Sequence, residues 1–147
     1  MSPVYHTVYA GFFSAVYGSV THSLWGSVLC FVSGILMDLD HLLDYILAKK
    51  RLTFSYKTLL SYFGSEKSGK IYIIFHSYEF IFLLWLFIAF YQLSVVWVGL
   101  AVGVTTHILL DKFHNPIRPF VYFLTYRMKN KFNKESIYPE DYFKRMT

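Results

Sequence analysis

Residues 71–110 form a long apolar run, IYIIFHSYEFIFLLWLFIAFYQLSVVWVGLAVGVTTHILL. Its only formally charged residue is Glu79. An apolar run of this length is sufficient for two membrane-spanning helices of about 20 residues each. We therefore predict helices over residues 71–91 and 94–113, joined by a tight turn.

The region that precedes this stretch is also apolar. Residues 3–36 contain no Asp, Glu, Lys or Arg, which predicts two further helices over residues 3–20 and 23–48. Hydrophobic residues make up 55% of the 147-residue chain and aromatic residues 21%, more apolar surface than a soluble domain of this size could bury. The fold class predicted is all-α, an integral membrane bundle of about four transmembrane helices in contact with membrane lipids.

The region after the last predicted span is more polar. Residues 117–126 follow Pro116 and are rich in aromatic side chains, which predicts a short helix resting on the membrane interface. Residues 129–147 are predicted to be a polar cytoplasmic tail, so that the membrane-embedded domain covers residues 1–128.

The basic residues predict the topology. All 14 Lys and Arg residues lie either in residues 49–70 or from Lys112 onward, and the turns at the opposite ends of the helices have none. The positive-inside rule therefore predicts cytoplasmic termini. We therefore interpret the net charge of +5 first as a sign of this topology. No nucleic-acid partner is expected, because the basic residues flank apolar spans instead of forming a recognisable binding module.

Ionisable residues inside the predicted spans gather at one depth. Each costs about 2.5–3.5 kcal/mol at the bilayer centre, so such residues usually have a function and a partner. A lone histidine is more often a packing residue, but here all four helices contribute to one layer near the cytoplasmic face. The eight residues are His6, Asp38, Asp40, His41, His76, Glu79, His107 and Asp111.

Their spacing and chemistry indicate a metal site. Three pairs lie three or four residues apart, so each pair can present both side chains to one point: Asp38 and His41, His76 and Glu79, His107 and Asp111. Imidazoles with carboxylates favour zinc, with manganese or iron as alternatives, and the lone Cys30 excludes a thiolate site. There are more candidate ligands than one tetrahedral ion needs. The site could therefore bind one or two ions, or one of the residues could act as a general base.

At these residues the chain resembles a known family. The motifs are His6 with Gly11, the run Gly34-Ile35-Leu36-Met37-Asp38-Leu39-Asp40-His41, the pair His76-Ser77 and the pair His107 and Asp111. Over about residues 6–111 the chain resembles the membrane-bound metal-dependent hydrolase family, also described as LexA-binding, inner-membrane-associated hydrolases. That family is related to zinc-dependent phospholipase C.

The resemblance implies roles for these residues. Direct metal ligands would be His6, Asp38, His76, His107 and Asp111, with Asp40 and His41 as ligands or partners of ligands. We predict His41 among the ligands, and Asp40 and Glu79 as catalytic bases. The chain departs from the family at Met37, where a proline is usual, and in the short lead-in to His76, and both departures bear on substrate class.

The leading hypothesis is a metal-dependent hydrolase at a bacterial-type inner membrane. Its substrate would be a phosphate ester in a lipid or lipid-linked molecule at the cytoplasmic face. One alternative is a non-catalytic protein, either a metal-stabilised scaffold or a partner of a cytoplasmic regulator. A small metal-ion transporter is disfavoured, because residues 81–91 and 95–104 offer almost no polar path across the bilayer.

Overall fold

The computed structural model describes residues 3–65, 69–115 and 117–139. In these residues the fold is all-helical, as predicted, apart from one isolated antiparallel bridge between Lys70 and Asn133. The chain divides into two compact units, one of Met1–Asp38 with Ser77–Asn115 and the other of Leu39–His76 with Pro116–Thr147. The elements are α1 (Pro3–Thr21), α2 (Leu24–Leu36), α3 (Leu39–Lys49), α4 (Tyr56–Ser65), α5 (Tyr78–Phe90), α6 (Val95–His114), the 3-10 helix η1 (Pro119–Tyr122), α7 (Leu124–Lys129) and α8 (Lys134–Ile137).

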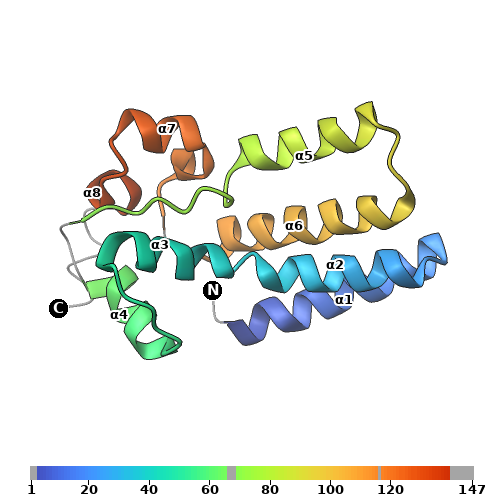
Figure 1. Ribbon diagram of the computed structural model, residues 1–147, viewed down its shortest axis with the longest axis horizontal. Coiled ribbons are helices and arrows are strands. Elements are labelled where there is room, and N and C mark those ends of the chain that lie inside the picture. The colour runs from blue at the N-terminus through green and yellow to red at the C-terminus, as the bar shows by residue number, and fades with distance from the viewer. Residues whose placement is uncertain (1–2, 66–68, 116, 140–147) are drawn as a thin grey trace. The chain divides into compact units, whose positions relative to one another are not determined.

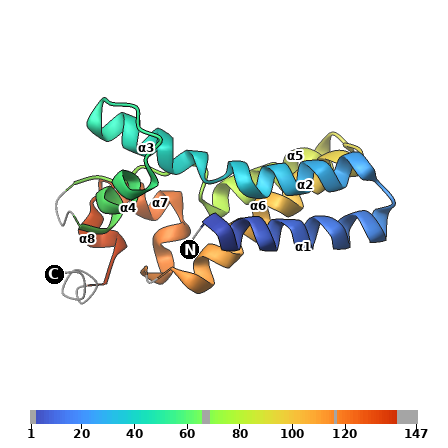
Figure 2. The same cartoon turned by 90° about the horizontal axis from the view of Figure 1, so that it is seen from below.

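The first unit is a bundle of four helices. Helix α2 packs against both α1 and α6, α1 also contacts α6, and α5 packs against α6 (Figures 1 and 2). Serine side chains start two of these helices by accepting a hydrogen bond from a backbone N–H of the first turn. Ser23 accepts from Gly26 at 3.1 Å and Ser77 from Phe80 at 3.2 Å.

Helices α2 and α6 approach so closely that their backbones touch. Small residues recur every four positions on the facing sides, at Gly26, Cys30 and Gly34 of α2 and at Gly99 and Gly103 of α6. A Cβ atom on Gly99 would collide with the carbonyl oxygen of Gly26, and one on Gly103 with that of Cys30. We call these five residues the glycine seam. Small residues at this spacing are typical of helix pairs in membranes.

Serine hydroxyls join the helices beside this seam. Ser14 of α1 and Ser27 of α2 each donate to the other residue's carbonyl oxygen at 2.7 Å. Ser33 donates to the carbonyl of Leu100 at 3.0 Å. The hydroxyl groups thus find partners on neighbouring helices, as polar groups in apolar bundles must.

Within the described residues, two stretches are long and apolar enough to cross a membrane, Leu24–Lys49 and Val95–His114. This is fewer than the four predicted. Helix α5 has only 13 residues, or about 20 Å at 1.5 Å per residue, against a hydrocarbon core of about 30 Å.

The start of one predicted helix was wrong, and another predicted helix is interrupted. The helix predicted from residue 71 begins at Tyr78, and residues 71–77 are not helical because side chains distant in sequence bind their backbone groups. The helix predicted over residues 23–48 is interrupted at residues 37–38, where Asp38 N–H bonds the carbonyl of Ile35 instead of continuing the α-helical pattern.

The second unit surrounds an extended segment, residues 70–76. A small core of Ile71, Val121 and Ile137 joins this segment to η1 and α8. The N–H of Ile71 donates to the carbonyl of Phe132 at 2.9 Å. These contacts connect the segment to the C-terminal helices, and α3 packs against α4.

The predicted interfacial helix and tail take a different form. The interfacial helix expected over residues 117–126 is divided into η1 and α7. The expected tail contains α8, in which Lys134 and Ile137 are buried, so the chain is packed at least to Ile137. The last eight residues, 140–147, lie outside the described part.

Candidate metal centre

His107 of α6 is held by the backbone of α2. Its Nδ1 lies 2.6 Å from the carbonyl oxygen of Gly34. A carbonyl only accepts, so Nδ1 must donate, which fixes the tautomer in the manner typical of metal-binding histidines. The other ring nitrogen, Nε2, lies 3.6 Å from Asp38 Oδ1 and 3.8 Å from Asp111 Oδ2.

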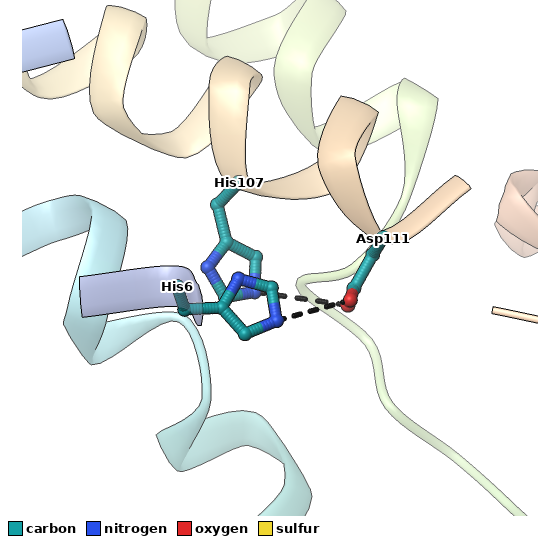
Figure 3. Close-up of side chains that lie close together, drawn as sticks. All are labelled: His6, His107 and Asp111. Carbon is teal, nitrogen blue, oxygen red and sulfur yellow. Dashed lines mark ion pairs between the residues drawn. The ribbon is translucent and has the colours of Figure 1, made fainter. Parts of the chain in front are cut away.

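His6 of α1 completes the cluster in the first unit (Figure 3). Its Nε2 lies 3.1 Å from Asp111 Oδ1, and its ring stacks on that of His107 with centroids 4.1 Å apart. His6, His107 and Asp111 are only 4%, 2% and 2% exposed. The buried Nδ1 of His6 has no hydrogen-bond partner among the described residues. Helices α1 and α6 thus bring buried polar groups to one point.

The separations in this cluster fit a divalent ion. One ligand atom each from His6, His107 and Asp111 lie within 4.8 Å of one another. A tetrahedral zinc ion with bonds of about 2.0–2.1 Å holds neighbouring ligand atoms about 3.3–3.4 Å apart. The distances of 3.1, 3.6 and 3.8 Å bracket that spacing, and Asp38 adjoins the cluster through its contact with His107.

Charge balance also favours a metal here. A neutral His107 directs the lone pair of Nε2 at two carboxylates, which is repulsive unless a cation lies between them. A divalent cation would neutralise both carboxylates.

A second group of predicted residues lies in the other unit. Asp40 of α3 accepts three hydrogen bonds on one oxygen, Oδ2: from the N–H of Phe75 at 2.8 Å, and from the N–H and Nδ1 of His76 at 3.1 Å each. His76 therefore has the same tautomer as His107, with Nε2 left as the possible ligand atom. The ring centroids of His41 and His76 lie 4.9 Å apart.

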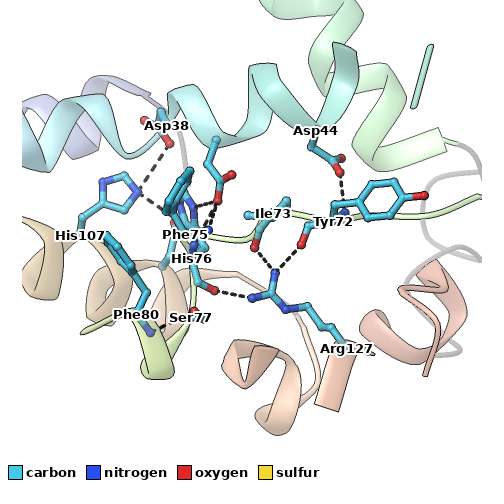
Figure 4. Close-up of polar contacts among 12 residues, drawn as sticks. Asp38, Asp44, Tyr72, Ile73, Phe75, His76, Ser77, Phe80, His107 and Arg127 are labelled. Atoms are coloured by element: carbon cyan, nitrogen blue, oxygen red, sulfur yellow. Dashed lines mark hydrogen bonds and ion pairs between the residues drawn. The ribbon is translucent and has the colours of Figure 1, made fainter. Parts of the chain in front are cut away.

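The segment that carries His76 is held from both edges (Figure 4). Asp44, one turn after Asp40, accepts a hydrogen bond from the N–H of Tyr72. Arg127 of α7 donates to the carbonyls of Tyr72 at 3.1 Å, of Ile73, and of His76 at 3.0 Å. Arg127 is only 2% exposed. Charged side chains thus replace the neighbouring strands that would otherwise bind this backbone.

The predicted site residues fall into two groups. His6, Asp38, His107 and Asp111 converge in the first unit, and Asp40, His41 and His76 in the second. Glu79 is half-buried in the first turn of α5 and does not belong to any group of converging ligand atoms in the described residues. Asp40 binds the segment of His76, so the contacts give it a structural role, and its role as a catalytic base stays a prediction.

The positioning roles of several residues were not predicted from the sequence. Gly34 supplies the carbonyl for His107, and Gly99 and Gly103 allow α6 to approach α2. The Gly-x3-Gly spacing of residues 99–103 was a readable signal for this contact. Arg127 carried no such signal, because nothing in its neighbourhood distinguishes it from the other basic residues near the C-terminus.

The chain is thus an all-helical protein with buried His/Asp clusters that could hold a metal ion. No protein-family model, curated protein or solved structure matches it. The resemblance to the membrane-bound metal-dependent hydrolases therefore stays a prediction.

Proposed function

We propose that this protein is a membrane-bound metal-dependent hydrolase of phosphate esters in lipid or lipid-linked substrates. The proposal rests on the contacts of the His107 ring. Its Nδ1 is bound to the carbonyl of Gly34, and its Nε2 faces the carboxylates of Asp38 and Asp111. The ring of His6 stacks on it. Zinc is the favoured ion, because the donors are nitrogen and oxygen at tetrahedral spacing.

The exposed surface of the first unit supports a membrane location. Large apolar side chains cover its outer faces, including Val8 (63% exposed), Phe82 (65%) and Phe90 (77%). Exposed apolar area on this scale marks contact with lipid or with another protein. We propose four spans with both termini in the cytoplasm of a bacterial-type cell, which places the basic residues on the inner side.

The chain's own residues suggest how a substrate is handled. A bound divalent ion supplies Lewis acidity, polarising a phosphoryl oxygen and lowering the pKa of coordinated water toward about 7. His6, His107 and Asp111 would hold the ion from the buried side. The Asp38 side chain is 33% exposed and would mark the side from which substrate and water arrive. Glu79 is the candidate proton acceptor in this unit.

The test is hydrolysis of phosphatidic acid and of a phosphodiester lipid by zinc-loaded protein in mixed micelles. We expect wild type and His22→Ala to be active and His107→Ala to be inactive, because His22 is exposed in the turn that follows α1. Glu79→Gln should lower kcat and leave bound zinc unchanged. Zinc-loaded wild type that hydrolyses no lipid phosphoester would contradict the proposal.

That contradictory result would favour a second function, a non-catalytic metal-stabilised scaffold. The supporting observation is the exposure of only 2–4% at His6, His107 and Asp111, since structural metal sites are closed. A scaffold should lose its cytoplasmic partner or its stability without zinc, and should show no turnover with any metal.

A further inference from the structure

Residues 70–76 are irregular, yet six of their polar backbone groups, three N–H groups and three carbonyls, bind three charged side chains of the second unit. On one edge, Asp40 and Asp44 accept the N–H groups of Phe75, His76 and Tyr72. On the other edge, Arg127 donates hydrogen bonds to the carbonyl oxygens of Tyr72, Ile73 and His76. A guanidinium group suits this task, since its planar fork carries five donors in a fixed geometry.

The segment also contains backbone strain. Ile73 has a φ of +29°, a conformation that a β-branched residue rarely adopts. Such a residue persists only where its surroundings over-determine it, and strain of this kind gathers at functional sites. Arg127 binds the carbonyl of this residue, so the guanidinium acts where the backbone most needs support.

We infer that Arg127 is a positioning residue for His76. It fixes the backbone on both sides of the strained Ile73, so that the His76 ring meets Asp40 with Nδ1 and presents Nε2 in one tautomer. This inference deepens the proposed function, because a fixed Nε2 matters most if the ring binds a metal or moves a proton. Arg127 itself needs no contact with metal or substrate.

The test reads the histidine ring directly and needs no activity. Full-length protein labelled with 15N-histidine is compared in detergent and chelator, with the His76 signals assigned from their loss in His76→Gln. In wild type we expect widely separated Nδ1 and Nε2 resonances, the signature of one tautomer. In Arg127→Ala the two should move toward a common averaged position, and a low, non-denaturing concentration of guanidinium should restore them.

Two controls separate positioning from general loss of structure. Arg118 of the same unit also donates to a backbone carbonyl, that of Tyr138 at 3.2 Å. Arg118→Ala should therefore leave the His76 resonances unchanged. His107 is bound to Gly34 within the other unit, and its signals should not move. Arg127→Lys keeps the charge without the fork and should average the His76 signals partly.

Three results would overturn the inference. These are unchanged His76 signals in Arg127→Ala or Arg127→Lys, an equal change in Arg118→Ala, and a joint shift of His76 and His107 that guanidinium does not reverse. Because chelator is present throughout, the result does not depend on metal binding. Failure of this inference is therefore distinguishable from failure of the proposed hydrolase.

Discussion

His107 and His76 are both held through the Nδ1 atom of the ring, but the acceptors of the two hydrogen bonds differ. Each donates from Nδ1 and keeps Nε2 for other partners. In the first unit the acceptor is a neutral backbone carbonyl, that of Gly34, made accessible by tight helix packing along the glycine seam. In the second unit the acceptor is a carboxylate, Asp40, and the segment is fixed by Arg127 from its other edge.

The difference shows two solutions to one positional problem. In an apolar bundle a carbonyl positions a ring without adding a charge, provided that the helices touch. In the irregular segment there is no helix backbone to carry the ring, so charged side chains hold it through several hydrogen bonds. We expect the first site to be sensitive to side-chain volume and the second to charge.

The largest effect should come from filling the glycine seam. Gly103→Ala would force a Cβ into the carbonyl of Cys30 and separate α2 from α6. Overpacking of this kind costs about 3 kcal/mol, so the free energy of unfolding should fall by that amount. Gly11→Ala is the matched control, because its Cβ would meet only ordinary contact with Phe31 at 3.9 Å. Denaturant unfolding in detergent measures both, and equal effects would show that the seam is not tight.

Removing metal should affect the first site next most strongly. With free zinc at 100 times its Kd, binding stabilises the folded state by about 2.7 kcal/mol, which chelator should abolish. His107→Ala, lacking a ligand, should unfold at the same temperature with and without zinc. Thermal unfolding checks this, and a zinc response retained in His107→Ala would place the ion elsewhere.

Charge removal should affect the second site by a somewhat smaller amount. Asp40→Asn turns a charged acceptor of three hydrogen bonds into a neutral amide, and should lower the free energy of unfolding by about 2 kcal/mol. Glu135→Gln removes an exposed carboxylate in the same unit and should change it by less than about 0.5 kcal/mol. If the two variants were equally stable, charge would not be what holds the segment.

The smallest effect should come from the serine pair between α1 and α2. The two hydroxyl oxygens lie 2.9 Å apart, so a double-mutant cycle of Ser14→Ala and Ser27→Ala should give a coupling free energy of about 0.6 kcal/mol, the average for hydrogen bonds between membrane helices. A coupling free energy as large as the effect of Gly103→Ala would mean that the serine hydrogen bonds between α1 and α2 stabilise the bundle as much as the close packing of α2 and α6.

The sequence predicted what depends on local pattern. Apolar runs predicted α1, α6 and the start of α2 within a few residues, and the spacing of His107 and Asp111 predicted that both face one point. The pattern failed at residues 71–77, where apolar residues suggested a helix but Asp40, Asp44 and Arg127 take the backbone hydrogen bonds. Contacts between residues so distant in sequence leave no periodic signal.

We propose that His6, His107 and Asp111 bind a divalent metal ion, and this can be tested by measuring metal content by plasma mass spectrometry. Detergent-purified wild type, reloaded with zinc or manganese and washed, is compared with the His107→Ala/Asp111→Ala variant and with His22→Ala. We predict about one or two ions per chain in wild type and in His22→Ala, with loss in the double variant. Metal-free wild type after reloading, or equal metal in all three proteins, would contradict the claim.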